Sequence, residues 1–387
     1  MTPGVRSRTF PLYAGGFLGP FGGAMLVALI PEVADGLDTT VRLVAASITA
    51  YMVPFAVLQL FSGTIGERVG GSRVVRIAYA AYGAAALLAA FAPEIWTFMG
   101  ARALMGAANA FVTPILLAAL SEAVPAGVLG RSVGTFAAVQ VAGLTLAPAL
   151  GGALGEISWR LGFVLVAVAG LALAIRGLGV QHAPAVERPR ATLRSLLNRW
   201  IALVAAKAVT GYLGFTSIGF VVALLCSREF GLSSAATGLV VAVYGVGGMA
   251  LGRYAGTIAD RIGRPRTAVL GTLACAGGVF ALAFAPSAWS VALVYFTVGC
   301  ASAFAWAALN TIVLEAFPQN RAGAVSAYSA FKFTGVAIAP LIYVPLFEDD
   351  PSLPFLLAAA FSVLCAALVT PWFRRYRLGQ PAPAAPA

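Results

Sequence analysis

Apolar runs of roughly twenty residues recur along the whole chain, and short segments rich in Gly, Pro and charged residues separate them. A helix of about 20 apolar residues is long enough to cross the hydrocarbon core of a bilayer. The pattern therefore predicts an all-α polytopic membrane protein. It places twelve transmembrane helices near residues 12–33, 43–64, 74–92, 96–120, 131–154, 159–180, 200–225, 236–259, 267–285, 288–314, 323–346 and 352–373.

The composition agrees with a location inside the bilayer. Of the 387 residues, 60% are hydrophobic and 10% are charged, whereas soluble domains carry about 25% charged residues. This excludes a soluble enzyme and a disulfide-stapled secreted module. The net charge of +11 taken alone suggests nucleic-acid binding. Nearly all of the charges, however, lie in short loops between apolar runs, where they indicate the orientation of the chain in the membrane. We expect a lipid bilayer as the surroundings and no nucleic-acid partner.

The basic residues of the loops are distributed unevenly. With the N-terminus in the cytoplasm, most of them fall on the cytoplasmic side, and Arg42, Arg160 and Arg228 fall outside. Cytoplasmic loops of membrane proteins carry such an excess of Lys and Arg. We therefore predict a multi-pass protein of the plasma membrane or bacterial inner membrane with both termini in the cytoplasm.

The two halves of the sequence repeat. The segment 63–73 (GTIGERVGGSR) returns as 256–266 (GTIADRIGRPR), and several single residues return at the same separation, among them Tyr51 as Tyr244 and Gly106 as Gly299. An even number of helices per repeat keeps the topology parallel. We predict six-helix halves at 1–180 and 200–375, a basic cytoplasmic linker at 181–199, and a disordered low-complexity tail at 376–387.

The repeated loop resembles the signature of the major facilitator superfamily, G-x-x-x-D/E-R-x-G-x-x-R/K, in two copies. The resemblance covers essentially the whole chain and implies a transporter that works by alternating access. It assigns gating or coupling roles to Glu67, Arg68, Arg73, Asp260, Arg261 and Arg266, together with Glu122 and Glu315, which match each other between the halves. A carboxylate at a helix end can bind arginines or a neighbouring helix N-terminus. The alternative is that these arginines only orient the chain.

The fifth predicted helix carries most of the family's antiporter signature, which is typical of exporters. Gly134, Gly143, Pro148, Gly151 and Gly152 hold their places, and Ala147 replaces one glycine. In the fourth helix, Arg102 and Gly106 resemble the R-x-x-x-G element of proton-coupled members. The alternatives are ordinary small-residue packing and an arginine that extends to the nearby outer interface.

One feature departs from drug–proton antiporters, which commonly carry an acidic residue inside the membrane. Here every acidic residue falls at a helix end or in a loop, and Glu32 at the outer end of the first helix is the nearest substitute. Two lysines do lie within spans, Lys332 at a depth of roughly 13 Å and Lys207 at a comparable depth. Intramembrane ionisable residues are candidates for function, although a structural lysine remains an alternative for both.

The residues expected to line a substrate cavity are aromatic or amide-bearing, which suits an amphipathic organic solute. They are Phe21, Tyr51, Asn109, Gln140, Tyr212, Tyr244, Trp306, Asn310 and Tyr328, with Lys207 and Lys332. The single histidine, His182, lies in the linker, and the four cysteines share no metal-ligand spacing. We therefore expect no metal, no cofactor and no catalytic residues.

Together these observations favour a secondary active transporter that exports small amphipathic or drug-like compounds as a monomer, with protons as coupling ions. Uptake or exchange of a small organic anion is the first alternative, because the lysines favour it, and a lipid or lysolipid flippase is another. A non-transporting sensor would need an output domain. An intramembrane enzyme would need a carboxylate pair, a metal cluster or a nucleophile–base pair within the spans.

Overall fold

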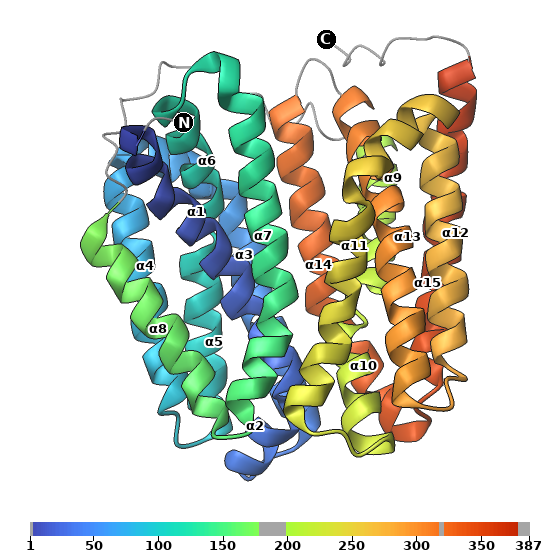
Figure 1. The fold of residues 1–387 in the computed structure, drawn as a ribbon, viewed down its shortest axis with the longest axis horizontal. Coiled ribbons are helices and arrows are strands. Elements are labelled where there is room, and N and C mark those ends of the chain that lie inside the picture. The colour runs from blue at the N-terminus through green and yellow to red at the C-terminus, as the bar shows by residue number, and fades with distance from the viewer. Residues whose placement is uncertain (1–2, 178–198, 317–320, 378–387) are drawn as a thin grey trace. The chain divides into compact units, whose positions relative to one another are not determined.

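The computed structural model describes residues 3–177, 199–316 and 321–377, and every regular element in these ranges is helical (Figure 1). Within these ranges, twelve stretches of helix are long and apolar enough to cross a membrane. This confirms the predicted fold class. Of the predicted linker and tail, only Arg199, which begins α9, and the last residues of α15 fall within the described part; the rest lies outside it.

The chain forms two compact units. The first comprises the described residues of Met1–Glu187 together with Cys226–Ala242, and the second comprises those of Arg188–Leu225 together with Val243–Ala387. The short segment Cys226–Ala242 thus packs with the first unit, although it follows the midpoint of the chain. It contains the first turns of α11 (Ser234–Ile262), a helix that continues into the second unit.

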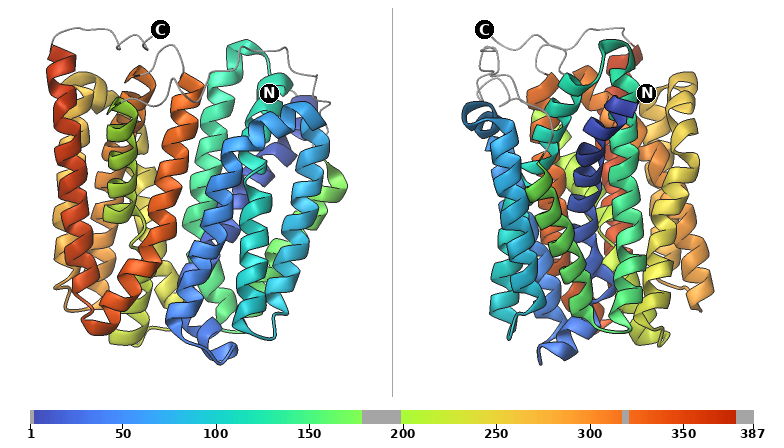
Figure 2. Two further views of the ribbon diagram at one scale, coloured as in Figure 1. Left: turned by 180° about the vertical axis from the view of Figure 1, so that it is seen from behind. Right: turned by 60° about the vertical axis from the view of Figure 1, so that its left-hand side comes forward.

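The first unit is built from the helices α1 (Pro3–Ala24), η1 (Met25–Ala28), α2 (Ile30–Gly36), α3 (Val41–Val69), α4 (Gly71–Ala90), α5 (Ile95–Asn109), α6 (Val112–Ala123), α7 (Ala126–Gly155) and α8 (Trp159–Arg176). The views of Figures 1 and 2 agree that α2 lies at the end of this unit opposite the N-terminus. Its strongest helix pairs are α4 with α8, α1 with α7 and α3 with α5.

Prolines explain why two of the predicted spans are interrupted in the first unit. Pro31 occupies the beginning of α2, and the chain tightens into the 3₁₀ turn η1 just before it. Pro114 lies in the first turn of α6, after the break that follows Asn109. A proline has no N–H group to continue the helix, and its ring clashes with the preceding turn, so both helices restart at these positions.

The second unit contains α9 (Arg199–Gly211), η3 (Tyr212–Thr216), α10 (Gly219–Leu224), the larger part of α11, α12 (Arg264–Leu282), α13 (Ala288–Ala316), α14 (Arg321–Asp349) and α15 (Leu353–Arg377). The π-helical turn η4 (Leu225–Glu229) begins at its border. Here α12 packs on both α13 and α15, and α14 packs on α9. The seventh predicted span is therefore one continuous path through α9, η3, α10 and η4, with π-helical turns at η3 and η4.

Glycines bring neighbouring helices close at equivalent places in the two units. A Cβ atom on Gly106 of α5 would overlap the main-chain carbonyl of Tyr51 on α3, and one on Gly299 of α13 would overlap that of Tyr244 on α11. Small residues allow such close approach of helix backbones. These four residues are the ones that matched at one separation in the sequence, so the repeat is also a repeat of packing geometry.

Candidate functional site

In the second unit, an aromatic cluster forms around the π-helical turn η3. The ring of Trp306 on α13 lies 4.7 Å from that of Tyr212 and 5.3 Å from that of Phe215, measured between centroids. The Trp306 indole Nε1 donates a hydrogen bond to Thr216 Oγ1 at 3.2 Å. π-Helical turns inside α-helices are frequent at functional sites, and this one carries two aromatic members of the cluster.

Two tyrosines extend the cluster to α11. The rings of Tyr244 and Tyr295 stack with centroids 5.1 Å apart, and the Tyr244 side chain interacts with those of Ser302, Thr216 and Trp306. The aromatic cluster thus comprises Tyr212, Phe215, Tyr244, Tyr295 and Trp306. Three of its members were expected from the sequence to line a cavity: Tyr212, Tyr244 and Trp306.

Tyr328 lies beside this cluster, whereas Asn310 is exposed on α13. The buried Tyr328 lies close to Tyr212, and its hydroxyl has no hydrogen-bond partner among the described residues. Lys332 follows one turn later on α14, half-buried, with Nζ 4.9 Å from the centroid of the Phe333 ring. Lys207 on α9 is completely buried, and its main-chain carbonyl accepts a contact of 3.5 Å from Cys365 Sγ.

In the first unit, Arg102 of α5 is completely buried and binds the end of α1. Its guanidinium donates to the main-chain carbonyls of Gly22 at 3.1 Å and Gly23 at 3.2 Å. It also lies 4.5 Å from the centroid of the Tyr51 ring. The side chain therefore does not extend to the outer interface. It holds the last turn of α1, where the helix gives way to η1, through the fixed fork of a guanidinium.

Other residues expected in the cavity of the first half make their own contacts. Asn109 Nδ2 donates to the Tyr51 hydroxyl at 2.8 Å, so these two residues belong with Arg102. Gln140 of α7 is half-buried and donates to Thr113 Oγ1 at 3.1 Å. Phe21 is buried and stacks on Phe17, with centroids 5.4 Å apart.

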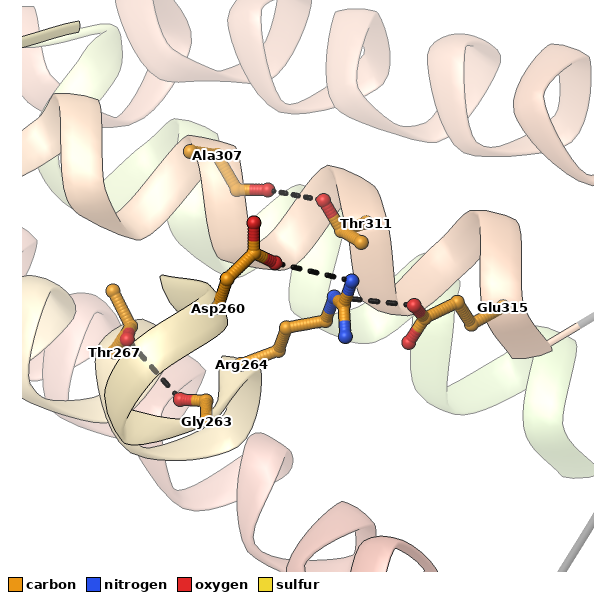
Figure 3. Close-up of polar contacts among 7 residues, drawn as sticks. All are labelled: Asp260, Gly263, Arg264, Thr267, Ala307, Thr311 and Glu315. Atoms are coloured by element: carbon orange, nitrogen blue, oxygen red, sulfur yellow. Dashed lines mark hydrogen bonds and ion pairs between the residues drawn. The ribbon is translucent and has the colours of Figure 1, made fainter. Parts of the chain in front are cut away.

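A charged triad joins three helix ends of the second unit (Figure 3). Arg264, the first residue of α12, makes an ion pair with Asp260 Oδ1 at 3.3 Å and another with Glu315 Oε1 at 3.1 Å. Asp260 was expected from the family motif and Glu315 from its match to Glu122 between the halves, whereas Arg264 was considered as a pairing arginine or an orientation signal and was not among the assigned gating residues. Its position four residues after Asp260, across the helix break at Gly263, is the sequence signal that would have identified it.

The remaining gating candidates differ in their surroundings. Arg68, Arg73, Glu122, Arg261 and Arg266 are exposed, and the side chain of Glu67 lies outside the described residues. The sequence also distinguishes the halves, since Gly71 occupies the position that corresponds to Arg264. The first half therefore has no arginine at the position of Arg264.

The antiporter-like residues of α7 form a packing surface within the first unit. A Cβ atom on Gly152 would overlap the main-chain carbonyl of Ser234, and one on Gly238 would overlap that of Pro148. A Cβ atom on Gly143 would lie only 2.5 Å from the carbonyl oxygen of Phe17 on α1. Gly134, by contrast, faces open space. The end of α7 is thus seated directly on the first turns of α11.

Two carboxylates lie where α7 ends and α11 begins. Glu156 Oε1 accepts a hydrogen bond of 3.0 Å from the Ala235 main-chain N–H, which holds the pKa of this exposed carboxyl below its ordinary value. Burial raises the pKa of Glu32 at the start of α2 and outweighs the hydrogen bonds to this carboxyl from its own main-chain N–H and from Ser234, which lower it; the charges of Asp35 and Glu156 raise it further. In the ranges that the structure describes, no three His, Cys, Asp or Glu residues are grouped closely enough to hold a metal ion.

The chain has relatives of similar length among known transporters. It is 24% identical over 336 residues to the uncharacterised MFS-type transporter YceJ of Bacillus subtilis, covering 84% of this chain and 85% of that protein. It is 25% identical over 307 residues to the multidrug resistance protein MdtG of Salmonella paratyphi C, covering 74% of each.

Solved structures share the fold at lower identity. A D-xylose–proton symporter superposes with a TM-score of 0.76 at 16% identity, over 93% of this chain and 96% of that one. A bacterial homologue of the human lysosomal transporter Spinster, inward-facing and unoccupied, gives 0.77 at 14% identity over 99% and 100%. The family model of the Major Facilitator Superfamily matches twice, at residues 12–216 and 204–386. As its repeated loops predicted, this chain is a multi-pass membrane transporter that belongs to the major facilitator superfamily.

Proposed function

We propose that the protein exports small amphipathic or drug-like organic compounds by alternating access, driven by the proton gradient. The observation that carries this proposal is the surface of α7, where Gly152 and Pro148 lie against the backbone of α11. Exporters of this superfamily carry small residues and proline at these positions, and here those residues permit the close contact. Two multidrug efflux pumps among the relatives support the same direction of transport.

The aromatic cluster supports an amphipathic substrate. Tyr212, Tyr244 and Trp306 combine large apolar faces with a few polar atoms, which is the composition that binds flat or partly apolar organic molecules. Arg102 supports proton coupling because it belongs to the R-x-x-x-G element. The acidic residues of the sequence, however, all fall at the ends of the predicted spans or in loops. The excess of basic residues in one set of loops supports an orientation of the protein in the membrane that places α2 on the outer side.

Transport into everted membrane vesicles tests this proposal directly. Energised vesicles should accumulate a fluorescent amphipathic dye, and collapse of the pH gradient with nigericin should release it. A matched sample of the Trp306→Ala variant should accumulate several-fold less dye while being present at the same level. The assay is repeated with a panel of cationic, neutral and anionic compounds. Equal uptake of every compound by vesicles with and without the protein would contradict export.

Exchange of a small organic anion is a second candidate, and Lys332 favours it. This lysine is half-buried, and Tyr328, whose hydroxyl has no hydrogen-bond partner among the described residues, lies one turn before it on the same helix. A lysine at this depth costs free energy as an isolated charge, so an anionic group of a substrate is a suitable partner. Counterflow of labelled anions in proteoliposomes without any pH gradient would distinguish exchange from proton-driven export.

A further inference from the structure

Arg253 is an exposed arginine inside a candidate membrane span of the second unit. It lies on α11, nine residues before the last residue, Ile262, which is about 13 Å along the helix axis. In the part of the chain that the structure describes, no carboxylate forms an ion pair with it. The nearest acidic residue of α11, Asp260, lies two turns later and binds Arg264. A charge at this depth needs water or an anionic partner.

Tyr254 holds the guanidinium of Arg253 in place. Arg253 Nη2 donates a hydrogen bond to the Tyr254 hydroxyl, and the guanidinium carbon lies 4.5 Å from the centroid of the Tyr254 ring. An arginine side chain has five N–H groups, so this one bond leaves most of them available. Together they form the planar fork that binds two oxygen atoms of a phosphate or carboxylate. The pair is therefore arranged to bind an anion.

The residues along α11 indicate what this face of the helix meets. Val246, Ala250 and Arg253 are separated by four and three residues, so they share one helix face, and all three are exposed. Gly252 and Gly256 lie beside Arg253, and a Cβ atom on either would meet nothing within 4 Å. An exposed apolar stripe on a membrane helix is a surface for lipid. Arg253 stands at one end of this stripe, with open space next to it.

The first unit has only hydrocarbon at the equivalent positions. At the separation that relates the two halves, Arg253 corresponds to Leu60 and Tyr254 to Phe61. Leu60 and Phe61 are both exposed on α3. The rest of the stripe is equally apolar and exposed there, at Val53 and Val57. The repeat therefore shows that packing does not require a charge at this position, and that the second half adds a guanidinium and a hydroxyl to a lipid-facing surface.

We propose that Arg253 and Tyr254 bind the phosphate group of an anionic phospholipid from the cytoplasmic leaflet. In the predicted orientation, Ile262 lies at the cytoplasmic end of α11, and a long basic side chain on a lipid-facing stripe extends toward the headgroups. The fork binds phosphate oxygens, Tyr254 fixes the fork near the membrane interface, and Gly252 and Gly256 leave room for the headgroup. An anionic lipid is preferred because a zwitterionic one already carries a cation beside its phosphate.

Native mass spectrometry of the full chain in detergent tests this site without any transport. Parent and Arg253→Leu are mixed in equal amounts and titrated with phosphatidylglycerol, so both meet the same lipid concentration. The leucine copies Leu60 of the first half, so the variant should fold. We expect its dissociation constant for the first lipid to be about fivefold higher, the effect of one basic residue near an anionic surface. Phosphatidylcholine should bind both proteins alike.

Two further variants on α11 examine the geometry of the site. Arg253→Lys keeps the charge but not the planar fork, and its affinity for phosphatidylglycerol should lie between those of the parent and Arg253→Leu. Tyr254→Phe keeps the ring and removes the hydroxyl that holds Nη2, so it should lose part of the affinity. Parental affinity in Arg253→Leu, with the protein folded, would overturn the proposal.

Two controls separate this site from charge in general and from soluble anions. Arg131→Leu removes another exposed arginine, in the second turn of α7, and should leave the affinity for phosphatidylglycerol unchanged. An equal loss in Arg131→Leu and Arg253→Leu would show that only the net charge matters. Inorganic phosphate should not displace the lipid from the parent, and displacement at millimolar phosphate would show that the pair takes a soluble anion instead. Either result would overturn the proposal. Because no export is measured, a failure of the proposed function would leave the outcome unaffected.

Discussion

Arg264 binds Glu315 through an ion pair of 3.1 Å between Nε and Oε1, and in this way the beginning of α12 is tied to the end of α13. The same guanidinium holds Asp260 at the end of α11. Both carboxylates are partly exposed, and exposed ion pairs stabilise a fold by only about 0–1 kcal/mol. The triad is therefore suited to hold one conformation relative to another rather than to hold the fold.

The first prediction concerns this triad. Asp260→Asn and Glu315→Gln should each lower the transport rate several-fold, because each removes one arm of the Arg264 bridge from the state in which it forms. Thermal unfolding in detergent should change little. Glu94→Gln, at an exposed helix end in the first unit, serves as the control. Parental transport in both triad variants would show that these charges only orient the chain.

The second prediction concerns the glycines that repeat between the units. Gly106→Ala and Gly299→Ala should each lower the free energy of unfolding by about 1–3 kcal/mol, because the new methyl group collides with main-chain carbonyls that cannot rotate away. Gly100→Ala and Gly277→Ala face open space and should be neutral or stabilise by up to about 1 kcal/mol. Melting curves of all four variants provide the comparison. If all four variants melted at the same temperature, the added methyl groups at Gly106 and Gly299 would be accommodated by a helix shift that costs no free energy.

These glycines illustrate what the sequence can predict. The spans, the repeat and the matched pairs of Tyr51 with Gly106 and Tyr244 with Gly299 follow from periodicity and spacing, because membrane helices need length and small contact residues. The positions at which helices break were harder to predict from the sequence. Pro31 and Pro114 mark breaks, but prolines also occur inside continuous helices such as α3 and α14, so a proline alone does not decide.

The site was predictable in its residues but less so in its pairings. Arg102 was expected from its motif, yet its partners are main-chain carbonyls of α1, and a sequence carries no signal for a bond to backbone. Arg264 was not assigned a gating role because it lies outside the shared motif and Gly71 stands at its counterpart in the first half. The hydrogen bond from Ser234 to the Gly152 carbonyl joins residues 82 positions apart, and only the fold brings them together.

The third prediction concerns Arg102. Arg102→Lys keeps the positive charge but has no planar fork to hold the carbonyls of Gly22 and Gly23 together. A buried carbonyl left unsatisfied costs about 1–3 kcal/mol, so the variant should melt at a lower temperature and transport poorly. Arg102→Met should be worse in both respects. Full activity of the lysine variant would mean that charge alone matters, and that the contact with α1 is incidental.

The fourth prediction concerns acid stability. The pKa of Glu156 is lowered in the folded protein by the Ala235 N–H, so its stabilising effect is complete above the ordinary carboxyl pKa and is lost as the pH falls through the folded value. Burial raises the pKa of Glu32, so its protonated form stabilises at low pH and this effect is lost as the pH rises. On acidification, the melting temperature of Glu156→Gln should therefore fall less steeply than that of the parent. As the pH rises toward neutral, the melting temperature of the parent should fall, whereas that of Glu32→Gln should not. The opposite order would show that the two carboxyls exchange roles.

The last prediction concerns Lys332, the charge that lies nearest to the unpartnered hydroxyl of Tyr328 along α14. Its ammonium group rests near the Phe333 ring, 4.9 Å from the centroid, and an aromatic face offsets only part of the cost of removing a cation from water. Lys332→Met keeps the length of the side chain and removes the charge. We expect the variant to fold and to lose transport at least several-fold, whichever of two roles the lysine has.

The two roles separate by substrate charge and by pH. If Lys332 binds an anionic group of the substrate, Lys332→Met should retain neutral compounds and lose anions in a counterflow panel, and Lys332→Arg should restore the anions. If Lys332 itself takes up and releases the coupling proton, the methionine variant should lose accumulation driven by the pH gradient but keep exchange, and arginine should not rescue it, because arginine does not deprotonate. Unchanged transport with unchanged pH dependence in Lys332→Met would assign the lysine a structural role, and the anion-exchange alternative would then lose the residue on which it depends.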